Sequence, residues 1–401
     1  MYNYGSEPTQ ICNIKEWSDL MSEIQDIQLD ENGLRKTPLY DYYVEKGVKL
    51  VDFGGWALPI QFSSIQEEHE AVRNSVGLFD ASHMGEVRVT GDDAIGFLDT
   101  VLSNDLTKVA DGQAIYNAVT NEEGYTLDDL IIYKNSDQDV MVTPNSSNYE
   151  KIFNWLQKHN DGSVEIVDET AEWGLIAIQG PDAEEVLAKV TDADLPSIKG
   201  YHFSADETVA GVEGVVVSRT GYTGEDGFEL YIPWNETRSI WEKLLEVGAD
   251  KNITECALGS RDTLRLEGGM ALYGNDLSEE INPLEGGIAF AVKTGDKKEV
   301  DYPGKAALEA YKELPASERR VSKGFELEGK GIARQGYEVY STDGETKIGE
   351  VTSGTKSPTF GKAIGYVMIN KEYADNNDEV LIQIRKNQVP AKLVAKNWLR
   401  R

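Results

Sequence analysis

Apolar residues along the chain follow two spacings, one typical of helices and one typical of strands. In residues 14–28 they recur every three or four positions, which predicts an amphipathic helix near the N-terminus. From residue 37 to about residue 310, short strand-like runs alternate with helical stretches, which predicts an α+β or α/β region. The clearest predicted strands are 85–89, 129–133, 174–179 and 214–219, and the clearest predicted helices are 94–102, 148–158, 182–190 and 241–245.

The C-terminal part of the chain has a different pattern. Between residues 319 and 394, short β-rich runs are separated by turns that contain glycine, asparagine or aspartate. These runs are 322–327, 338–340, 348–352, 362–368 and 380–384. We therefore expect a small all-β domain at the C-terminus.

The composition narrows the class of protein. The chain has 401 residues and a net charge of −31, which would repel phosphate backbones and argues against generic nucleic-acid binding. We find no run of about 18 apolar residues and no secretory signal, so we expect a cytoplasmic protein without a membrane span. With only two cysteines, Cys12 and Cys256, and four histidines, we expect neither a disulfide framework nor a metal site.

Charge is distributed unevenly along this acidic chain. Residues 381–401 contain no acid, and their basic residues are Arg385, Lys386, Lys392, Lys396, Arg400 and Arg401. A cationic surface on an acidic protein attracts an anionic partner or ligand, but a solvated basic tail has the same pattern. Both interpretations stay open at this point.

Three segments contain residue types that suit chemistry. Asp128 and Asp129 lead into an apolar strand, in which consecutive side chains face opposite sides, so that one carboxylate enters a pocket while the other faces away. Capping or solvation is the commoner role of such acids. Residues 219–230 contain three glycines within seven positions, which suits either a bulged hairpin or a loop that approaches a ligand. Arg261 and Arg265 lie one helical turn apart, where they pair with acids or clamp an anionic group.

Together these segments resemble the glycine cleavage T-protein family. The matching motifs are Arg-Thr-Gly-Tyr-Thr-Gly-Glu-Asp-Gly-Phe-Glu at 219–229, Asp-Asp-Leu-Ile-Ile-Tyr at 128–133 and Arg-Asp-Thr-Leu-Arg-Leu-Glu at 261–267. Further similar segments include Ser-His-Met-Gly-Glu at 82–86, Asn-Pro-Leu-Glu-Gly-Gly at 282–287 and Gly-Ile-Ala-Arg at 331–334. The resemblance covers about residues 37–398, nearly the whole chain.

The resemblance implies an α+β fold with three domains in a clover-leaf around a central folate channel. It divides the chain into three parts. Residues 1–36 are an N-terminal extension that holds the amphipathic helix. Residues 37–315 are a folate-binding α+β region of two intertwined domains, and residues 316–401 are a C-terminal β-barrel.

The resemblance also implies an activity. The expected reaction converts an aminomethyl-dihydrolipoyl carrier, the H-protein of glycine cleavage, and tetrahydrofolate into 5,10-methylene-tetrahydrofolate, ammonia and the dihydrolipoyl carrier, without a metal. Asp128, the first aspartate of the pair, is expected beside the folate, where an ionised carboxylate stabilises developing positive charge. The implied folate-binding residues are Tyr116, Asn145, Tyr222, Glu229 and Arg261.

Two other functions fit parts of this pattern. A folate-dependent demethylase would take its carbon from a small methyl donor, and a non-catalytic folate-binding scaffold would have no turnover. The scaffold paralogues associated with iron–sulfur assembly carry a reactive cysteine motif in place of Gly-Tyr-Thr-Gly, which this chain retains. We therefore favour an enzyme.

Overall fold

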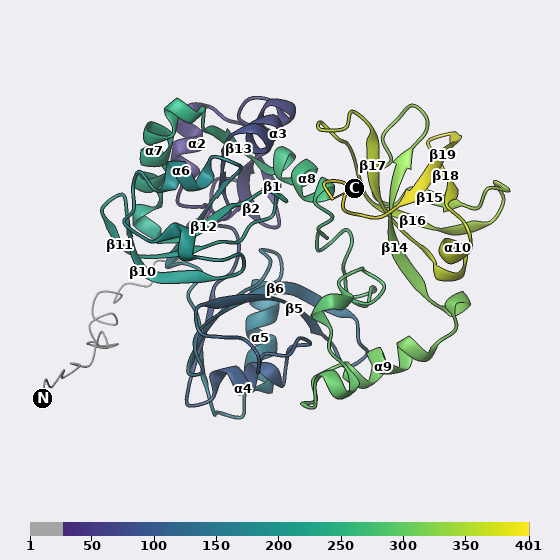
Figure 1. Cartoon of the computed structure of the whole chain (residues 1–401), viewed down its shortest axis with the longest axis horizontal. Coiled ribbons are helices and arrows are strands. Elements are labelled where there is room, and N and C mark those ends of the chain that lie inside the picture. The colour runs from purple at the N-terminus through teal and green to yellow at the C-terminus, as the bar shows by residue number, and fades with distance from the viewer. Residues whose placement is uncertain (1–26, 401) are drawn as a thin grey trace, which may run out of the picture.

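The computed structural model describes residues 27–400, which form three lobes (Figure 1). The helix predicted over residues 14–28 falls almost entirely outside the described range. Residues before Thr37 already belong to the first lobe, because the Arg35 N–H donates to the Gly55 carbonyl at 2.8 Å and the Ala57 N–H donates to the Arg35 carbonyl at 2.9 Å. Among residues 27–400, no helix is long and apolar enough to cross a membrane.

The first lobe is built on a six-stranded mixed sheet with the order β10-β11-β12-β9-β3-β13. Strand β12 pairs antiparallel with β9, and the edge strand β13 runs parallel to β3. The strands are β3 Gly77–Asp80, β9 Trp173–Gln179, β10 Phe203–Val209, β11 Val212–Ser218, β12 Gly227–Pro233 and β13 Thr254–Cys256, with a separate hairpin of β1 Leu50–Phe53 and β2 Trp56–Pro59. The helices are α2 Tyr40–Lys46, α3 Ile65–Asn74, α6 Ala183–Leu187, α7 Thr237–Val247 and α8 Leu258–Glu267, and the 3₁₀ turns are η1 Leu195–Ser197, η2 Trp234–Glu236 and η3 Ala249–Lys251.

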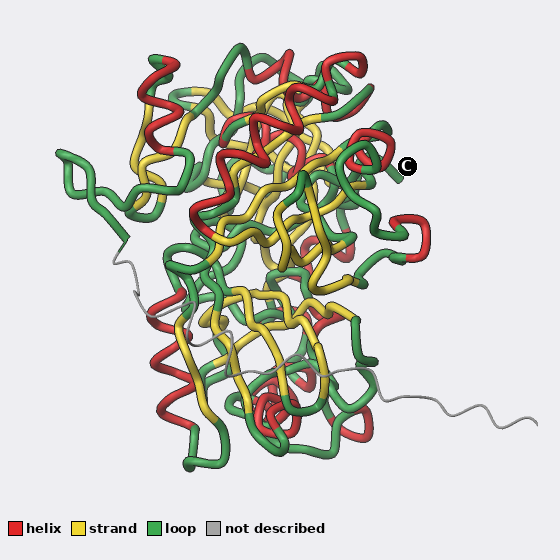
Figure 2. Tube along the Cα trace, turned by 90° about the vertical axis from the view of Figure 1, so that its left-hand side faces the viewer, coloured by secondary structure: helices red, strands yellow, loops and turns green. Residues whose placement is uncertain are grey.

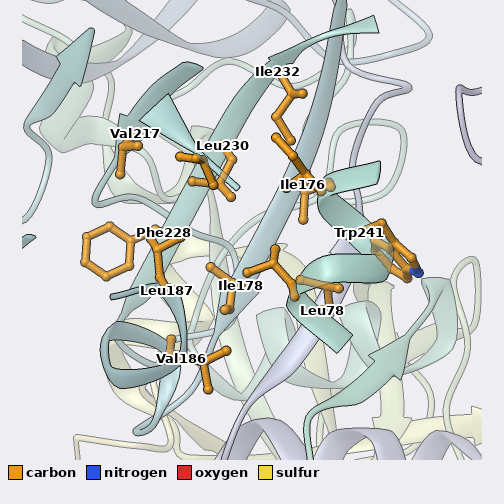
Figure 3. Packing of buried hydrophobic residues seen from close by; sticks show 14 of the residues in the cluster. Leu78, Ile176, Ile178, Val186, Leu187, Val217, Phe228, Leu230, Ile232 and Trp241 are labelled. Atoms are coloured by element: carbon orange, nitrogen blue, oxygen red, sulfur yellow. The ribbon is translucent and has the colours of Figure 1, made fainter. Parts of the chain in front are cut away.

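The hydrophobic core of this lobe lies between one face of the sheet and helices α6 and α7 (Figure 3). On β12, the buried residues Phe228, Leu230 and Ile232 are two positions apart and point into this core. Burial of large apolar side chains stabilises the lobe by roughly 1.5–3 kcal/mol for each one that is fully enclosed. The residue between the first two, Glu229, therefore projects from the opposite face of the sheet.

The second lobe contains a five-stranded sheet with the order β5-β6-β7-β4-β8, whose strands form the lower group in Figure 2. Leu130 and Ile132 of β6 pack in its core with side chains from helix α5, such as Ile152 and Leu156. The elements are β4 Val87–Thr90, β5 Gln113–Thr120, β6 Thr126–Ser136, β7 Asp139–Thr143, β8 Glu165–Asp168, α4 Ala94–Asp99 and α5 Tyr149–His159. The opposite face of β6 is turned away from this core.

The third lobe is a closed barrel with the strand order β14-β17-β16-β15-β18-β19. It follows a connection that contains η4 Ala289–Ala291, η5 Gly295–Lys297, α9 Lys305–Glu313 and η6 Ala316–Glu318. The barrel elements are β14 Arg320–Leu327, β15 Glu338–Tyr340, β16 Lys347–Lys356, β17 Ala363–Asn370, α10 Lys371–Asn376, β18 Glu379–Ile384 and β19 Asn387–Val394. Five of these strands contain the β-rich runs predicted from the sequence. Strand β19 lies inside the predicted all-β domain, but no β-rich run was predicted at its position.

Candidate functional site

A cavity of about 350 Å³, here called the site cavity, is lined by residues from both large sheets and from α8. Five of the predicted site residues line it. They are Tyr116 on β5, Asn145 just after β7, Tyr222 in the β11–β12 loop, Glu229 on β12 and Arg261 on α8. All five side chains are partly exposed, as residues around an open cavity must be.

The remaining predicted residue, Asp128, does not line the site cavity, whereas its neighbour Asp129 does. Asp128 is fully buried on the core side of β6. Its carboxylate accepts hydrogen bonds from the Asn145 backbone N–H at 3.0 Å, the Asn145 amide at 2.8 Å and the Asn148 amide at 2.7 Å. Strand alternation separates the two acids, as the sequence predicts. The carboxylate that faces the site cavity is that of Asp129 and not that of Asp128, to which the sequence analysis gave the place beside the folate.

Asp129 is held in place from two sides. The Tyr116 hydroxyl donates to its Oδ2 at 2.7 Å, and the Asn145 amide donates to its Oδ1 at 3.1 Å. Burial raises the pKa of both Asp128 and Asp129, and repulsion from Asp129 raises that of Asp128 further. Adjacent buried acids that ionise less readily than usual are typical of active sites.

Arg261 owes its position to the start of α8. The buried carboxylate of Glu68 accepts hydrogen bonds from the Ala257 N–H at 3.0 Å and the Ser260 hydroxyl at 2.7 Å, and a negative charge there complements the helix dipole. The Arg261 guanidinium lies over the Tyr222 ring, 5.1 Å from its centroid. It forms no hydrogen bond or ion pair with residues 27–400, and burial lowers its pKa. Its donors are therefore available to a ligand.

Glu229 faces the site cavity because it alternates with core residues on β12. The Thr220 hydroxyl donates to its Oε2 at 2.5 Å, while Oε1 has no hydrogen-bond partner within the described part of the chain. Burial raises the pKa of Glu229, and the Thr220 hydrogen bond and the charge of Arg261 act in the opposite direction. One carboxylate oxygen is thus free to accept a hydrogen bond from a ligand.

The loop between β11 and β12 places Tyr222 beside these groups. The Tyr222 hydroxyl donates to the Ala271 carbonyl, which directs the ring toward the cavity. A Cβ atom on residue 221 would lie 2.0 Å from the side-chain oxygen of Gln179, so any residue other than glycine would require this buried side chain to shift. Gly224 has a φ of +82°, a left-handed conformation that glycine adopts without strain. The glycines therefore shape the hairpin, and the tyrosine and glutamate line the cavity.

Arg265, one turn after Arg261, has a different environment. Its Nη1 donates to Asp276 at 2.7 Å, its Nη2 donates to the Ser353 hydroxyl at 2.8 Å, and its Nε donates to Asp262 at 2.9 Å. Arg265 and Asp276 are almost completely buried. The predicted alternative of ion pairing thus holds for Arg265 and does not hold for Arg261.

The last residue of α8, Glu267, is paired in the same way. Its carboxylate contacts Arg73 Nη2 at 3.1 Å and His69 Nε2 at 3.1 Å, and it accepts hydrogen bonds from the hydroxyls of Ser357 at 2.5 Å and Thr359 at 2.7 Å. We call these residues, with Arg265, Asp276 and Ser353, the paired cluster. It connects α8 to α3 and to the barrel.

Among the other residues that line the site cavity, His83 and Lys396 carry ionisable groups that the sequence did not single out as site residues. His83 is 1% exposed, and its Nδ1 has no hydrogen-bond partner among residues 27–400. Burial and the charge of Arg261 lower the pKa of His83 well below its usual value, which favours the neutral ring. Lys396, from the basic C-terminal segment, donates to the Gly286 carbonyl at 3.0 Å and to the Ser322 hydroxyl at 3.1 Å. His83 was detectable only as part of the Ser-His-Met-Gly-Glu motif, and Lys396 only as part of a charge run.

The site cavity combines charges of both signs. Carboxylates of Asp129 and Glu229 lie in the same cavity as the cations of Arg261 and Lys396. Among residues 27–400, no group of three or more histidine, cysteine, aspartate or glutamate side chains is arranged to hold a metal ion. The arrangement suits a polar heterocycle with several donors and acceptors and a reaction that develops positive charge.

Comparison with known proteins identifies the family. Residues 39–296 match the sequence model described as the GCVT N-terminal domain, and residues 320–399 match the glycine cleavage T-protein C-terminal barrel domain. The chain belongs to the glycine cleavage T-protein family. The predicted resemblance and the predicted α+β fold with a C-terminal barrel are confirmed.

Relatives within the T-protein family are similar over nearly the whole chain. An aminomethyltransferase from Bacillus cytotoxicus and one from Bacillus cereus are each 50% identical over 368 residues, which is 92% of this chain and 99% of the relative. The crystal structure of glycine cleavage system aminomethyltransferase T from Bartonella henselae has a TM-score of 0.81 and 29% identity, and the match covers 91% of this chain and 99% of that one. These similarities confirm the predicted enzyme class, an aminomethyltransferase of glycine cleavage, and disfavour the demethylase and scaffold alternatives.

Proposed function

We propose that this aminomethyltransferase uses tetrahydrofolate as the acceptor and a lipoylated carrier, the H-protein of glycine cleavage, as the donor of the one-carbon unit. The observation that carries the proposal is a set of charged side chains in one cavity that form no ion pair with residues 27–400. Asp129, Glu229 and Arg261 all direct polar atoms into it, although buried charges normally find partners within the protein. A ligand that supplies the missing partners explains why these three charged side chains lie in the cavity.

Tetrahydrofolate suits the binding groups of this cavity. A pterin has an amide-like edge with adjacent donors, and the free oxygen of Glu229 is positioned to accept from such an edge. The Tyr222 ring offers a flat apolar surface for the heterocycle, and Arg261 offers donors for its acceptor atoms. In this proposal, Glu229, Tyr222 and Arg261 bind the pterin, while Tyr116 and Asn145 hold Asp129 in position.

The reaction forms a cationic intermediate, which the carboxylate of Asp129 would have to stabilise. The C–S bond of the aminomethyl thioether breaks to leave an iminium ion and a thiolate, and a tetrahydrofolate nitrogen then attacks the iminium carbon. Ring closure by the second folate nitrogen expels ammonia. The two folate N–H groups lose two protons in all, of which one completes the ammonia and the other protonates the thiolate. An ionised Asp129 stabilises the cationic carbon, because a preorganised opposite charge in a partly dry site is worth far more than in water. The role that the sequence predicts for Asp128 is therefore proposed for Asp129.

An assay with a lipoylated carrier tests the proposal. The protein is mixed with aminomethylated carrier and tetrahydrofolate, and ammonia and methylene-tetrahydrofolate are measured together. We expect equal amounts of both products, and no ammonia above the uncatalysed rate when tetrahydrofolate is left out. Ammonia release that does not depend on folate would contradict the proposed acceptor. The cytoplasmic location expected from the sequence is part of the same proposal, and cell fractionation tests it.

A further inference from the structure

Glu229 is held on one side by a group of buried hydroxyls. Strand β11 ends at Ser218, which lies opposite Glu229 in the pairing of β11 with β12, so both side chains project from the same face of the sheet. Thr220 follows two residues later, and its hydroxyl donates to Glu229 Oε2 at 2.5 Å. The hydroxyl of Ser218 lies 2.9 Å from that of Thr220, and the hydroxyl of Tyr133 lies 3.4 Å from it. We call Ser218, Thr220 and Tyr133 the hydroxyl set.

The charge of Glu229 fixes the direction of the hydrogen bonds in the hydroxyl set. An ionised carboxylate only accepts, so the single hydrogen of the Thr220 hydroxyl must be the one donated to Glu229. The hydroxyls of Ser218 and Tyr133 must then donate to the two lone pairs of the Thr220 oxygen. A hydroxyl that is occupied in this way cannot rotate toward another acceptor. Its bond to the carboxylate oxygen Oε2 therefore leaves Oε1 of Glu229 turned toward the site cavity.

The backbone around Thr220 is fixed as well. The side-chain amide of Gln179 donates to the Thr220 carbonyl at 3.1 Å and to the Phe228 carbonyl at 3.3 Å. Phe228 directly precedes Glu229, so one amide joins the loop that carries Thr220 to the strand that carries Glu229. Gln179 and Ser218 are fully buried, and Thr220 is 6% exposed. A buried polar network whose members are paired keeps its groups in one arrangement.

The hydroxyl set also connects the two lobes that share the site cavity. Ser218 and Thr220 belong to the first lobe, whereas Tyr133 is on β6 of the second lobe. Tyr133 lies four residues after Asp129 and on the same face of β6, because side chains alternate along a strand. The strand that carries Asp129 thus contacts, through Tyr133, the hydroxyl that holds Glu229. This contact places the two cavity carboxylates relative to each other.

We infer that Thr220 is a positioning residue for tetrahydrofolate binding: supported by Ser218 and Tyr133, it keeps Glu229 ionised and turns Oε1 toward the pterin edge. This inference rests on the proposed function, in which Glu229 accepts hydrogen bonds from the pterin. Thr220 itself need not touch the ligand, because it acts through the carboxylate that it holds.

The charges around Glu229 make its protonation sensitive to Thr220. Burial raises the pKa of Glu229, whereas the Thr220 hydrogen bond and the charge of Arg261 act to lower it. The other ionisable side chains near Glu229 are tyrosines whose own pKa values are raised by burial, so they are neutral: Tyr133, Tyr201 and Tyr231. Without the Thr220 hydroxyl, the pKa of Glu229 should therefore rise further, and the carboxylate should be lost as an acceptor at a higher pH.

Tetrahydrofolate titrations of matched variants test the inference. Thr220→Val keeps the shape of the side chain and removes the hydroxyl, whereas Thr220→Ser keeps the hydroxyl. The control Thr237→Val removes a buried hydroxyl that donates to the Trp234 carbonyl at 2.9 Å, and Thr237 does not line the site cavity. Calorimetry measures the dissociation constant of each protein over a pH range that begins at 4.5, the usual pKa of a glutamate, and ends above neutrality.

We expect Thr220→Val to weaken tetrahydrofolate binding by about tenfold or more at neutral pH, because a hydrogen bond to a charged group is lost. Binding by every protein should weaken as the pH is lowered and Glu229 gains a proton, and in Thr220→Val this weakening should begin at a higher pH. Thr220→Ser and Thr237→Val should keep the affinity and the pH profile of the unmodified protein, even where they lower the melting temperature. Asp129 and tetrahydrofolate titrate in all of these proteins, so a difference between their pH profiles reports on Glu229.

Tyr133→Phe tests the contribution of the second lobe. This substitution keeps the ring and removes the hydroxyl that donates to Thr220. We expect the pH profile to change in the same direction as in Thr220→Val, but by less, because the bond between Thr220 and Glu229 remains. A larger change in Tyr133→Phe than in Thr220→Val would contradict the inferred order of these contacts.

The remaining outcomes are distinct. If Thr220→Val matched the unmodified protein in affinity and in pH profile, the positioning inference would be overturned and the proposed function would stand. Equal loss of affinity in Thr220→Val and Thr220→Ser, with an unchanged pH profile, would assign Thr220 to packing alone and also overturn the inference. Absence of tetrahydrofolate binding by the unmodified protein would instead refute the proposed function.

Discussion

Two arginines on α8, one turn apart, show the difference between the paired cluster and the site cavity. Arg265 donates to Asp276, Ser353 and Asp262 and connects α8 to the barrel. The guanidinium of Arg261 stacks on Tyr222 and has no hydrogen-bond partner among residues 27–400. Burial acts to lower the pKa of both arginines. At Arg265 the nearby groups, above all Asp276, outweigh burial and raise the pKa, whereas at Arg261 burial prevails and the pKa is lowered. The same residue type on the same helix face thus serves structure in one place and is left available in the other.

The carboxylates of the two regions differ in the same direction. Burial raises the pKa of Glu229 and of Asp129 in the site cavity. Burial acts on Glu267 too, but hydrogen bonds from His69, Ser357 and Thr359 outweigh it and lower its pKa to about 2. A charge that remains unpaired in a cavity costs stability, and a ligand that pairs it recovers that energy on binding. We therefore expect substitutions in the paired cluster to reduce stability, and substitutions of the charged residues in the site cavity to reduce binding or activity.

The largest expected effect is on stability, in the paired cluster. Arg265→Ala leaves the buried carboxylate of Asp276 without its cation, so we expect the free energy of unfolding to fall by about 3–5 kcal/mol. Urea denaturation of the variant and of the unmodified protein measures this difference in the free energy of unfolding. The matched change Arg261→Ala should leave the free energy of unfolding unchanged or slightly higher and should weaken tetrahydrofolate binding. Equal destabilisation by the two substitutions would contradict the distinction between the paired cluster and the site cavity.

The next effect concerns the two faces of β6. Asp129→Asn removes the charge at the cavity and keeps the shape, so we expect kcat to fall by about a hundredfold or more with little change in melting temperature. Asp128→Asn places an amide against three amide donors and should instead lower stability by about 1–3 kcal/mol. Steady-state kinetics and thermal unfolding of both variants decide the point. Near-normal turnover of Asp129→Asn would remove Asp129 from the proposed chemistry.

A smaller effect is expected on folate affinity. Glu229→Gln keeps an acceptor for Thr220 but turns a donor toward the pterin edge, so tetrahydrofolate binding should weaken by about 2–3 kcal/mol. Calorimetric titration measures the dissociation constant. In the paired cluster, the matched change Glu267→Gln should reduce stability and leave affinity nearly unchanged. If Glu229→Gln bound tetrahydrofolate as tightly as the unmodified protein, Glu229 would not contact the pterin.

The smallest expected effect is that activity and stability are lost over different pH ranges. Asp129 must be ionised to act, and burial raises its pKa to about 6, so kcat should fall as the pH is lowered through about 6. Repulsion from Asp129 acts on Asp128, whose pKa is raised to about 7, so Asp128 is already largely protonated when Asp129 titrates. Asp128→Asn should therefore leave this acidic limb nearly unchanged. The lowered pKa of Glu267 contributes stability that is present above its usual value of 4.5 and is lost between 4.5 and about 2. Loss of activity and loss of structure at the same pH would contradict this separation.

Much of the fold could be predicted from the sequence because its elements have regular spacing. The five β-rich runs of the barrel and the helices that include α5 and α7 were visible as local patterns. Strand β19 was not, because its alternating positions, such as Lys392 and Leu393, lie within a run dominated by basic charge. Its pairing with β14 and β18 depends on segments that are distant along the chain or joined by a tight turn.

The cavity residues were identified by family motifs, but the choice between Asp128 and Asp129 required the structure. Both faces of β6 are apolar beyond the acids, since Leu130 and Ile132 meet the core while Ile131 and Tyr133 lie on the other side. No polar face marks which side is open, so alternation alone cannot assign the two acids. The different roles of Arg261 and Arg265 were hidden for a similar reason, because the partners of Arg265 include Ser353, which is 88 residues away.

The most direct test of the central claim is the structure of the protein with tetrahydrofolate bound. We predict the pterin in the site cavity, with its donor edge on the free oxygen of Glu229, its ring against Tyr222, and its reactive nitrogens beside the carboxylate of Asp129. Asp128 should keep its three hydrogen bonds and make no contact with the ligand. Tetrahydrofolate bound elsewhere, or bound with its reactive nitrogens away from Asp129, would contradict the account.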